Sequence, residues 1–359
     1  MIFFSGCDYF RMSRNPEVIQ AAARTLHRDG LSVSASRVTT GNHAIFQALE
    51  RELCKFFEAD AALLTPDGYT TNMIVAQSLA GTIKKVYIDD RAHAALRDAT
   101  RFLDCPIQEF EHRNPASLAR LARRDRTEGP ALLLTDGMFA LNGSIAPLAE
   151  YRRIMPRDTI FLVDDAHGAG VVGRTGKGSL EEEGVSRTGI IQTVALSKAI
   201  GAFGGAILAT GRLRQLVLEK SRAFAGAIPV PLPIASAAVR SLQLLQSSPE
   251  WLRRLRQNKQ TVVSCLGEGG IFVPPSPGPI VRLEPINASA STRVCAALSR
   301  AGIYPPFLRY PPSDPKGYFR IVVSSEHSRR ELLRLVSVLT PLKHQFVQSS
   351  PKQTPGCAK

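Results

Sequence analysis

The chain contains 359 residues, of which 44% are hydrophobic and 21% are charged. This composition excludes an intrinsically disordered protein, because the chain has enough apolar side chains to offset the entropy lost on folding. Lys and Arg number 45 against 31 Asp and Glu, so the net charge is +14. A charge of this size bears on the partners of a protein and not on its fold.

The sequence also predicts a compartment. It contains no run of about eighteen apolar residues, so no transmembrane helix is expected. Its first residues, MIFFSGCDYF, have neither the basic region nor the long apolar region of a secretory signal. The six cysteines form no CxxC pair and have no metal-ligand spacing. We therefore expect a cytoplasmic protein with free thiols, no metal site and no association with membranes.

Apolar segments and helical patterns alternate from residue 42 to residue 211. Helices are predicted for Asn42–Phe57 and Asn114–Arg123, where apolar residues recur at helical spacing. Several of the apolar segments lack polar alternation, which indicates strands buried on both faces, as in a parallel sheet covered by helices. This part of the chain is therefore predicted to have an α/β fold. Six segments are predicted as strands: Ala61–Leu64, Lys85–Ile88, Ala131–Leu134, Ile160–Asp164, Ile191–Leu196 and Gly205–Ala209.

The pattern changes after residue 211. Helices are predicted for Arg212–Ser221, for one long segment from Ala235 to about Gln257, and for Ser328–Leu342, and a strand for Tyr318–Ser324. This mixture predicts a smaller α+β domain. The expected organisation is an N-terminal segment 1–40 that joins the small domain, a large domain 41–235, the small domain 236–343 and a disordered tail 344–359.

A GxGxxG motif, formed by Gly168, Gly170 and Gly173, follows one of the predicted strands. A dinucleotide-binding site needs this motif to open a helix, with an acid about twenty residues later. Here the next residues are Arg-Thr-Gly-Lys-Gly, which cannot begin a helix, and no acid follows at the required distance. Lys177-Gly178 also lacks the Ser or Thr of a P-loop. Both nucleotide-binding interpretations are therefore rejected.

Two predicted strands end in polar residues that suit pyridoxal phosphate (PLP). One strand runs into Asp164, Asp165 and His167, and the next into Ser197 and Lys198. Ligands bind beyond the carboxyl ends of strands in open parallel sheets, so these side chains are expected in one crevice. The aldehyde of PLP needs a lysine amine, its pyridine nitrogen needs a carboxylate, and its 3-oxygen needs a hydrogen-bond donor. Taken singly, each residue is better explained as a helix cap or a surface residue, but together they favour a cofactor site.

Asp164–Gly178 and Leu196–Gly201 resemble motifs of the α-oxoamine synthases, fold-type I PLP enzymes that include 8-amino-7-oxononanoate synthase and 2-amino-3-ketobutyrate CoA ligase. The resemblance covers roughly residues 5 to 342. It implies the fold of type I PLP-dependent transferases, with a mainly parallel, seven-stranded sheet flanked by helices and a smaller α+β domain. It also implies a homodimer. Further motifs occur in the family's order: Ser36-Arg37 with Gly41 and Leu49-Glu50, then residues 67–72, 90–98, 110–114, 142–148 and 320–327.

The resemblance implies a role for each matching residue. Lys198 would form the Schiff base with the cofactor and remove the α-proton of the substrate. Asp164 would pair with the pyridine nitrogen, and His167 would hydrogen-bond the 3-oxygen. The other expected residues are His93, stacked on the ring; Gly68, Tyr69 and Ser197, at the phosphate; and Arg320, Asn72 and Arg37, for the substrate.

The chain departs from the family's motifs at residues that carry hydroxyl groups there. Ala195 stands where the family has a Ser or Thr that binds phosphate, three residues before the lysine. Ala140–Ser144 replaces an SMDGD segment, and Phe224–Pro229, with Gly226, lacks the hydroxyls of a segment that reaches the partner subunit's phosphate. Each lost hydroxyl is expected to weaken phosphate binding by about 1 kcal/mol.

The implied activity is PLP-dependent C-acyl transfer, in which an amino acid condenses with an acyl thioester and loses its carboxylate to give an α-aminoketone. The donor would be acyl-CoA or an acyl carrier protein, both acidic, which suits a basic chain. An aminotransferase or lyase of the same fold stays open as an alternative, and so does a regulatory or scaffolding protein without activity. Nucleic-acid binding is not favoured, because the basic residues are spread along helices and are not clustered with aromatic residues.

Overall fold

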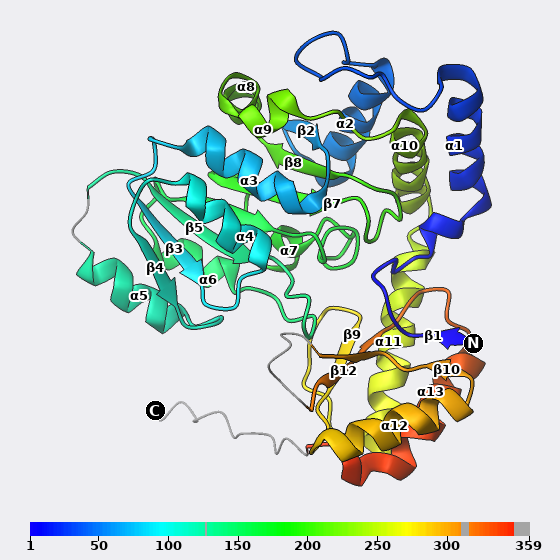
Figure 1. The fold of residues 1–359 in the computed structure, drawn as a ribbon. Helices are drawn as coiled ribbons and strands as arrows, with labels where there is room; N and C mark the ends of the chain where they lie inside the picture. The colour runs from blue at the N-terminus through cyan, green and yellow to red at the C-terminus, as the bar shows by residue number, and fades with distance from the viewer. Residues whose placement is uncertain (126–127, 310–315, 348–359) are drawn as a thin grey trace. The chain divides into compact units, whose positions relative to one another are not determined.

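The computed structural model describes residues 1–125, 128–309 and 316–347 (Figure 1). The chain forms two compact units. The larger unit consists of Cys7–Ala140 and Ser144–Leu252, and the smaller one of Met1–Gly6, Leu141–Gly143 and the chain from Arg253 onwards. Over the described ranges, no helix is both long and apolar enough to cross a membrane.

The larger unit is built on a seven-stranded sheet. Its strands are β2 (Ala61–Thr65), β3 (Lys85–Asp89), β4 (Ile107–Phe110), β5 (Ala131–Asp136), β6 (Ile160–Asp164), β7 (Ile190–Ala195) and β8 (Gly205–Ala209). Their order is β2-β8-β7-β6-β5-β3-β4, and all neighbours are parallel except β8, which is antiparallel to β2 and β7. The predicted sheet is confirmed, with all six predicted strands; β4 was not predicted.

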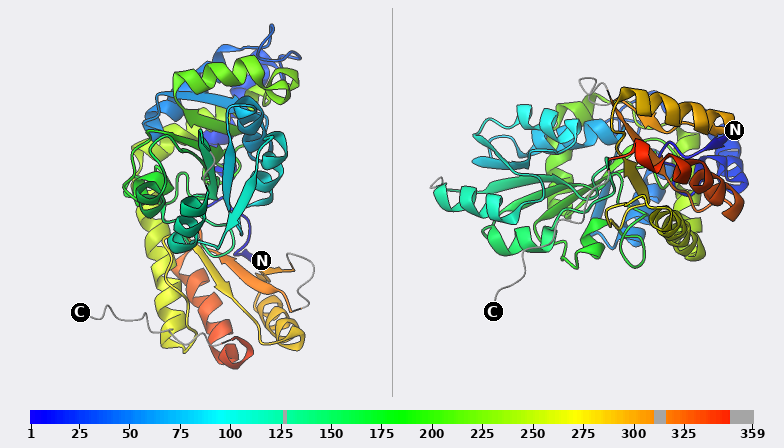
Figure 2. Two further views of the ribbon diagram at one scale, coloured as in Figure 1. Left: turned by 90° about the vertical axis from the view of Figure 1, so that its left-hand side faces the viewer. Right: turned by 90° about the horizontal axis from the view of Figure 1, so that it is seen from below.

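Helices cover both faces of this sheet (Figures 1 and 2). Alternate residues of a strand point to opposite faces, and in β5 both sets are apolar: Leu132 and Leu134 join one buried cluster and Leu133 another. The first cluster includes residues of α3 (Gly68–Leu79), α4 (Ala94–Ala99), α8 (Gly211–Lys220) and α9 (Arg222–Gly226). The opposite face is covered by α2 (Ala44–Phe57), α5 (Pro115–Arg124), α6 (Leu148–Ile154), α7 (Ser179–Glu182) and α10 (Leu232–Ser247).

The prediction of one long helix from Ala235 to Gln257 is wrong. Helix α10 ends at Ser247, and a second helix, α11 (Glu250–Glu268), follows it. The break falls at Ser248, whose backbone lies outside the helical region, with φ −132° and ψ 71°. The next residue is Pro249, and a residue that precedes proline is driven out of the helical region by the proline ring.

The N-terminal segment also differs from the prediction. Only Met1–Gly6 clusters with the smaller unit, whereas the predicted segment extended to residue 40. The helix α1 (Pro16–Asp29) packs on α10, where the Ser236 hydroxyl donates to the carbonyl of Ala21 at 3.2 Å. Asn15 caps α1 by accepting the N–H of Glu17 at 2.9 Å, so a helix begins where the sequence analysis expected part of the small domain.

The smaller unit has an α+β structure, as predicted. Three antiparallel strands pair in the order β11 (Phe307–Leu308), β12 (Tyr318–Val322) and β9 (Ile280–Leu283). A separate parallel pair joins β1 (Ile2–Phe3) to β10 (Ile303–Tyr304). The helices of this unit beyond α11 are α12 (Ala288–Arg300), α13 (Arg329–Leu339) and a 3-10 helix at Thr340–Gln345.

The predicted disordered tail, 344–359, begins too early. Gln345 ends the 3-10 helix, Phe346 is buried, and the N–H of Val347 donates to the carbonyl of Glu284 at 2.8 Å. The buried ring of Phe346 belongs to the apolar cluster of the smaller unit, which holds this segment in place. The remainder of the predicted tail, 348–359, lies outside the described residues.

Candidate active site

Strands β5 and β6 of the larger unit end in buried acids at one edge of the sheet. The last residue of β5, Asp136, is paired in register with the last residue of β6, Asp164. On its other side Asp164 is paired with Thr193 of β7. Because the strands are parallel, these side chains emerge at the same edge, as predicted for Asp164.

Asp164 is a buried carboxylate with two hydrogen-bond donors. Its Oδ2 accepts from the side-chain amide of Asn72 at 2.6 Å, and its Oδ1 accepts from the N–H of Ala166 at 3.1 Å. Burial raises the pKa of Asp164 above its ordinary value, while these hydrogen bonds and the charges of His93 and Lys198 lower it. A carboxylate that is ionised away from water needs a positive partner, and the protonated ring nitrogen of PLP is a suitable one.

Asn72 does not occupy the position expected of a substrate-binding residue. Its side chain is 0% exposed. Its amide nitrogen donates to Asp164, and its amide oxygen accepts from the hydroxyl of Thr193 at 2.8 Å. Because both ends of the amide are used inside the protein, Asn72 holds the Asp164 carboxylate in place and does not offer a surface to a substrate.

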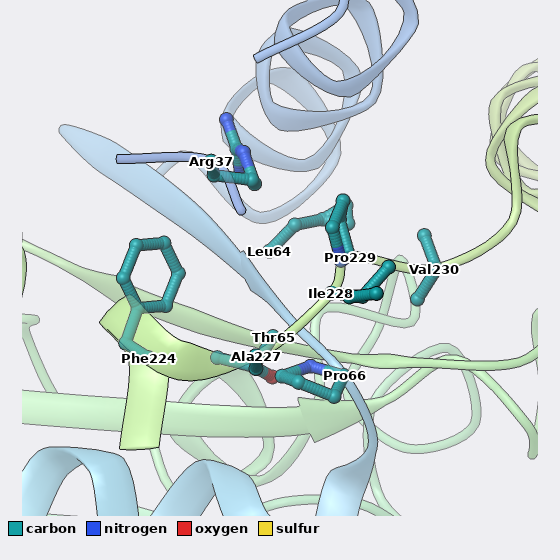
Figure 3. A pocket seen from close by; sticks show the side chains of 9 residues that line it. All are labelled: Arg37, Leu64, Thr65, Pro66, Phe224, Ala227, Ile228, Pro229 and Val230. Atoms are coloured by element: carbon teal, nitrogen blue, oxygen red, sulfur yellow. The ribbon is translucent and has the colours of Figure 1, made fainter. Parts of the chain in front are cut away.

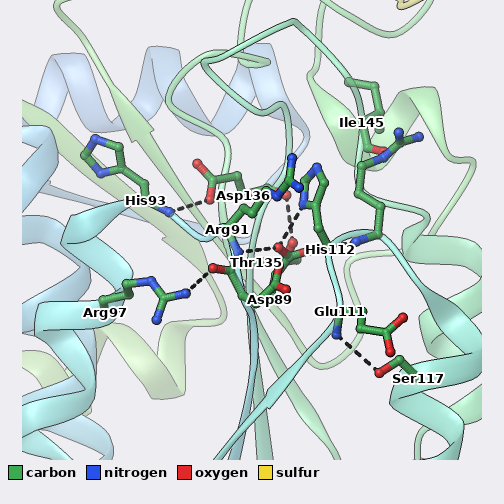
Figure 4. A network of polar contacts seen from close by, with 12 residues as sticks. Asp89, Arg91, His93, Arg97, Glu111, His112, Ser117, Thr135, Asp136 and Ile145 are labelled. Carbon is green, nitrogen blue, oxygen red and sulfur yellow. Dashed lines mark hydrogen bonds and ion pairs between the residues drawn. The ribbon is translucent and has the colours of Figure 1, made fainter. Parts of the chain in front are cut away.

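Asp136 is a second buried acid that the sequence analysis did not single out. Its Oδ2 accepts the N–H of His93 at 2.8 Å (Figure 4). Burial first, and the neighbouring Asp164 second, raise the pKa of Asp136 well above its ordinary value. Two carboxyl groups this close do not both ionise readily. We assign the negative charge to Asp164, which has the better donors. The signal that pointed to Asp164, a buried strand ending in an acid, is also present at Asp136.

His93 and Tyr69 lie at the starts of two helices beside this edge. His93 caps α4, where its Nδ1 accepts the N–H of Ala95 at 3.2 Å, and the residue is exposed. The two rings meet edge to face with their centroids 6.1 Å apart, and the Tyr69 hydroxyl donates to Asp98. An exposed imidazole in a fixed orientation is compatible with stacking on a cofactor ring. This role of His93 stays a proposal.

His167 and Lys198 follow the ends of β6 and β7. His167 is buried, and its Nδ1 lies 2.9 Å from the hydroxyl of Tyr9. Lys198 is half-buried and Ser197 is exposed, in a turn closed by the hydrogen bond from the N–H of Gly201 to the carbonyl of Lys198 at 3.0 Å. The larger unit thus brings the predicted lysine, histidine and aspartate to the same edge of the sheet.

The start of α3 forms a cradle against the end of β7. Asp67 caps the helix by accepting the N–H of Thr70 at 2.8 Å. A Cβ on Gly68 would lie 2.8 Å from the Cβ of Ala195, so the helix approaches β7 this closely only because residue 68 is glycine. The first-turn N–H groups, which include those of Gly68 and Tyr69, lie outside the helical ladder and favour an anion such as the phosphate of PLP. The residues present therefore fit this cofactor.

A substitution pair tests this cradle. Gly68→Ala is expected to weaken PLP binding and to lower the melting temperature, because overpacking costs about 1–3 kcal/mol. Adding Ala195→Gly removes the clashing Cβ and leaves only the Cα of residue 195, at 3.4 Å, so the double variant should recover both properties. PLP titration and thermal unfolding of the four proteins measure this, with Ala195→Gly as the control. A double variant as impaired as Gly68→Ala would show that the clash is not the cause.

Asp165 accounts for Gly168, the first glycine of the motif that resembles a nucleotide-binding loop. Its Oδ2 accepts the N–H of Ser179 at 2.8 Å and the side-chain amide of Gln192 at 2.7 Å. A Cβ on Gly168 would lie 2.1 Å from Oδ1, and one on Gly178 would lie 2.0 Å from Oδ2. Gly168 and Gly178 therefore pack around a buried carboxylate of the same loop. A Cβ on Gly170 would instead lie 2.7 Å from the Cβ of Ala199, and one on Gly173 would lie 2.5 Å from Oε2 of Glu181.

Stability is expected to depend on the protonation of Asp165. Burial raises the pKa of Asp165 to about 7. Because this pKa is higher in the folded protein than in the unfolded chain, the stability it contributes is present below about pH 4 and is lost as the pH rises towards about 7. The free energy of unfolding should fall over this range, and by less in Asp165→Asn, with a difference on the order of a few kcal/mol. Urea unfolding at several pH values measures this, and equal losses in both proteins would contradict the assignment.

Arg37 lies in the wall of a mostly apolar pocket of the larger unit (Figure 3). Its buried guanidinium forms an ion pair with Glu50 and donates to the Oδ1 of Asn42 at 2.8 Å. The guanidinium also lies over the ring of Phe46, 5.4 Å from the centroid. The other lining residues are Leu64, Thr65, Pro66, Phe224, Ala227, Ile228, Pro229 and Val230. A role of Arg37 in substrate binding stays a proposal.

Arg320, the residue expected to bind the carboxylate of the amino acid, belongs to the smaller unit. It is half-buried in β12, in register with Arg282 of β9. Both neighbours of Arg320 in the strand, Phe319 and Ile321, are buried in the apolar cluster of that unit. The guanidinium therefore projects from the opposite face of the strand. Its role stays a proposal.

Within the described ranges, one group of side chains could reach a common metal ion: Asp89, Asp90 and His112. The carboxylate of Asp89 is already engaged (Figure 4). Its Oδ1 accepts the N–H of Arg91 at 2.9 Å and lies 2.9 Å from Nδ1 of His112, and its Oδ2 accepts the N–H of Arg113 at 3.0 Å. These contacts tie the loop after β3 to the segment after β4, which is a structural role.

Comparison with known proteins identifies the family to which the chain belongs. A model of the family "Aminotransferase class I and II" matches residues 4–339. The chain is 32% identical over 348 residues to 8-amino-7-oxononanoate synthase of Xylella fastidiosa, which covers 94% of this chain and 85% of that protein. It is 31% identical over 334 residues to a putative 8-amino-7-oxononanoate synthase of Desulforudis audaxviator, which covers 92% of this chain and 86% of that protein.

Solved structures share the fold. Serine palmitoyltransferase from S. paucimobilis, with a bound PLP–myriocin aldimine, has a TM-score of 0.89 at 23% identity, over 96% of this chain and 87% of that one. For 8-amino-7-oxononanoate synthase from Francisella tularensis the TM-score is 0.81 at 22% identity, over 95% and 97% of the two chains. From the family match and the relatives above 30% identity, the chain belongs to the aminotransferase class I and II family and, within it, to the PLP-dependent α-oxoamine synthases.

Proposed function

We propose that the protein condenses an amino acid with an acyl thioester, so that the thiol leaves and the carboxylate of the amino acid is released as CO2, giving an α-aminoketone. The observation that supports this best is the convergence of Asp164, His167 and Lys198 on one edge of the sheet, beside the glycine start of α3. PLP, when bound, supplies the electron sink that stabilises negative charge at the α-carbon of the amino acid.

Each polar side chain at this edge of the sheet has one role in the proposed reaction. Lys198 Nζ removes the α-proton of the amino acid. Asp164 stays ionised and holds a proton on the ring nitrogen of the cofactor, and the donors on its two oxygens, Asn72 and Ala166, fix its orientation. Asp136 stays protonated, so that of the two paired acids, Asp136 and Asp164, only Asp164 carries a negative charge. His167 would donate a hydrogen bond to the 3-oxygen of PLP.

Two arginines bind the substrates in this proposal. Arg320 holds the carboxylate of the amino acid through a bidentate pair, for which a guanidinium has the matching geometry. Arg37 contacts the acyl substrate from the wall of its pocket, where apolar residues such as Leu64, Phe224 and Val230 can cover a hydrocarbon chain.

The net charge and the family support the remaining parts of the proposal. The acyl donor is acyl-CoA or an acyl carrier protein, both acidic, and a chain of net charge +14 attracts either of them. The protein works as a homodimer in the cytoplasm. The alternative to this activity is amino-group transfer by an enzyme of the same fold, which would need a keto acid and no thioester.

The deciding experiment supplies the purified, PLP-loaded protein with glycine, alanine or serine, each with and without an acyl-CoA. Release of free CoA and CO2 that depends on the thioester is the expected result. Formation of a keto acid without thioester would favour the aminotransferase; because no keto acid is supplied to accept the amino group, at most one equivalent per bound PLP is expected. No product of either kind would overturn both. Raising the ionic strength should raise the KM for the acyl donor, because salt screens the attraction between charges.

A further inference from the structure

A tyrosine far away in the sequence contacts the proposed PLP-binding histidine. Tyr9 and His167 are 158 positions apart, yet the Tyr9 hydroxyl lies 2.9 Å from Nδ1 of the imidazole. The two rings meet edge to face, with their centroids 6.5 Å apart and their planes at 71°. Tyr9 is 0% exposed and His167 is buried. A buried hydroxyl is almost always hydrogen-bonded, so this contact is part of the folded state.

The segment that carries Tyr9 is held in place by its own hydrogen bonds and by the turn after Lys198. Asp8 accepts the N–H of Met12 at 2.9 Å and that of Ser13 at 3.0 Å, and Met12 is fully buried. A Cβ on Gly201 would lie 2.5 Å from the backbone nitrogen of Ser13 and 2.6 Å from the Cβ of Met12. The segment therefore packs tightly on the turn that follows Lys198, and the tyrosine hydroxyl has a fixed position.

The contact with Tyr9 determines which ring nitrogen of His167 carries the proton. A neutral histidine carries its proton on one ring nitrogen and accepts with the other, and the partner of one nitrogen sets the state of both. A phenol that donates to Nδ1 places the proton on Nε2. His167 then presents an N–H donor at Nε2, which is the group that the 3-oxygen of PLP requires in the proposed function.

We propose that Tyr9 is a positioning residue that fixes His167 in its Nε2–H tautomer and orients it toward the cofactor. Tyr9 does not touch the reacting atoms and acts only through the imidazole. This inference rests on the proposed function for the role of His167, but the tautomer itself can be measured without any turnover.

The test measures the tautomer of His167 by two-bond nitrogen–proton NMR on the full chain with labelled histidine, with and without PLP. His167→Gln assigns the signal. We expect the Nε2–H tautomer in the wild-type protein and a partial or complete shift to Nδ1–H in Tyr9→Phe. The absorbance of the bound cofactor should also change in Tyr9→Phe, and kcat should fall about tenfold with little change in KM.

A matched control is Tyr87→Phe, which removes another buried tyrosine hydroxyl of the larger unit, one that donates to Asp125 at 2.9 Å. It should leave the tautomer of His167 and the cofactor spectrum unchanged. The wild-type measurement decides the question even if Tyr9→Phe fails to fold, because Nδ1–H in the wild type would overturn the proposal. A shifted tautomer in a protein that makes no aminoketone would retain the positioning role and refute the proposed function.

Discussion

Lys198→Ala is expected to abolish aminoketone formation, with kcat lower by at least about 10²–10⁴-fold. The alanine side chain cannot bond to the cofactor aldehyde and cannot take the α-proton from the amino acid, so two tasks are lost at once. The measurement is thioester-dependent release of CO2, combined with the absorbance band of the lysine-bound cofactor, which should be missing.

Lys220→Ala is the matched control for this variant. Lys220 is exposed in the last turn of α8, so its loss removes a lysine without touching the sheet edge. Both turnover and the cofactor band should remain as in the wild type. Turnover by the Lys198 variant above a few per cent of the wild-type rate would rule out the assignment of the lysine.

Asp164→Asn is expected to lower kcat by about 10²–10³-fold, a loss typical of removing one preorganised electrostatic group. The amide has the same shape as the carboxylate and can still accept from Asn72 or Ala166, so the fold should be retained. It has no charge with which to hold a proton on the ring nitrogen. The substitution removes a buried charge but also leaves one of these two N–H donors without an acceptor, and the two effects oppose each other, so the melting temperature should change little.

Asp136→Asn is the matched control, since Asp136 is the buried acid of the next strand in the sheet. If it is protonated in the working protein, the amide should change kcat by less than about tenfold. Steady-state rates and thermal unfolding of both variants measure this. A larger loss in Asp136→Asn than in Asp164→Asn would show that the negative charge resides on Asp136 and would reverse the two assignments.

The parts of the fold that depend on local pattern could be predicted from the sequence. Strands such as Ile160–Asp164 were recognisable because both faces of the sheet are covered, which makes the whole segment apolar. The broken helix could not be predicted from apolar spacing, which continues on both sides of Ser248. β4 was missed because residues such as Ile107 and Glu109 are exposed at the edge of the sheet.

In the site, too, the residues marked by local pattern could be predicted and those placed by distant contacts could not. Asp164 and Lys198 could be predicted because each follows a buried strand, and parallel strands end at one edge. The partners that set their chemistry lie far away along the chain: Asn72 is 92 positions from Asp164, and Tyr9 is 158 positions from His167. Local periodicity carries no information about such contacts, because only the packing of the elements creates them.

Strand β8, which is antiparallel to its neighbours in the seven-stranded sheet, sets the spacing of the whole site. Since it runs against both β2 and β7, those two strands point the same way with one strand between them, about 9–10 Å apart. The chain leaving β2 must cross the beginning of β8 to meet the end of β7. It does so over Gly205, where a Cβ would lie 2.2 Å from the Thr71 hydroxyl. A Cβ at residue 205 would also lie 2.5 Å from the carbonyl oxygen of Asp67, so a single methyl group there would push the start of α3 away from the turn that carries Lys198.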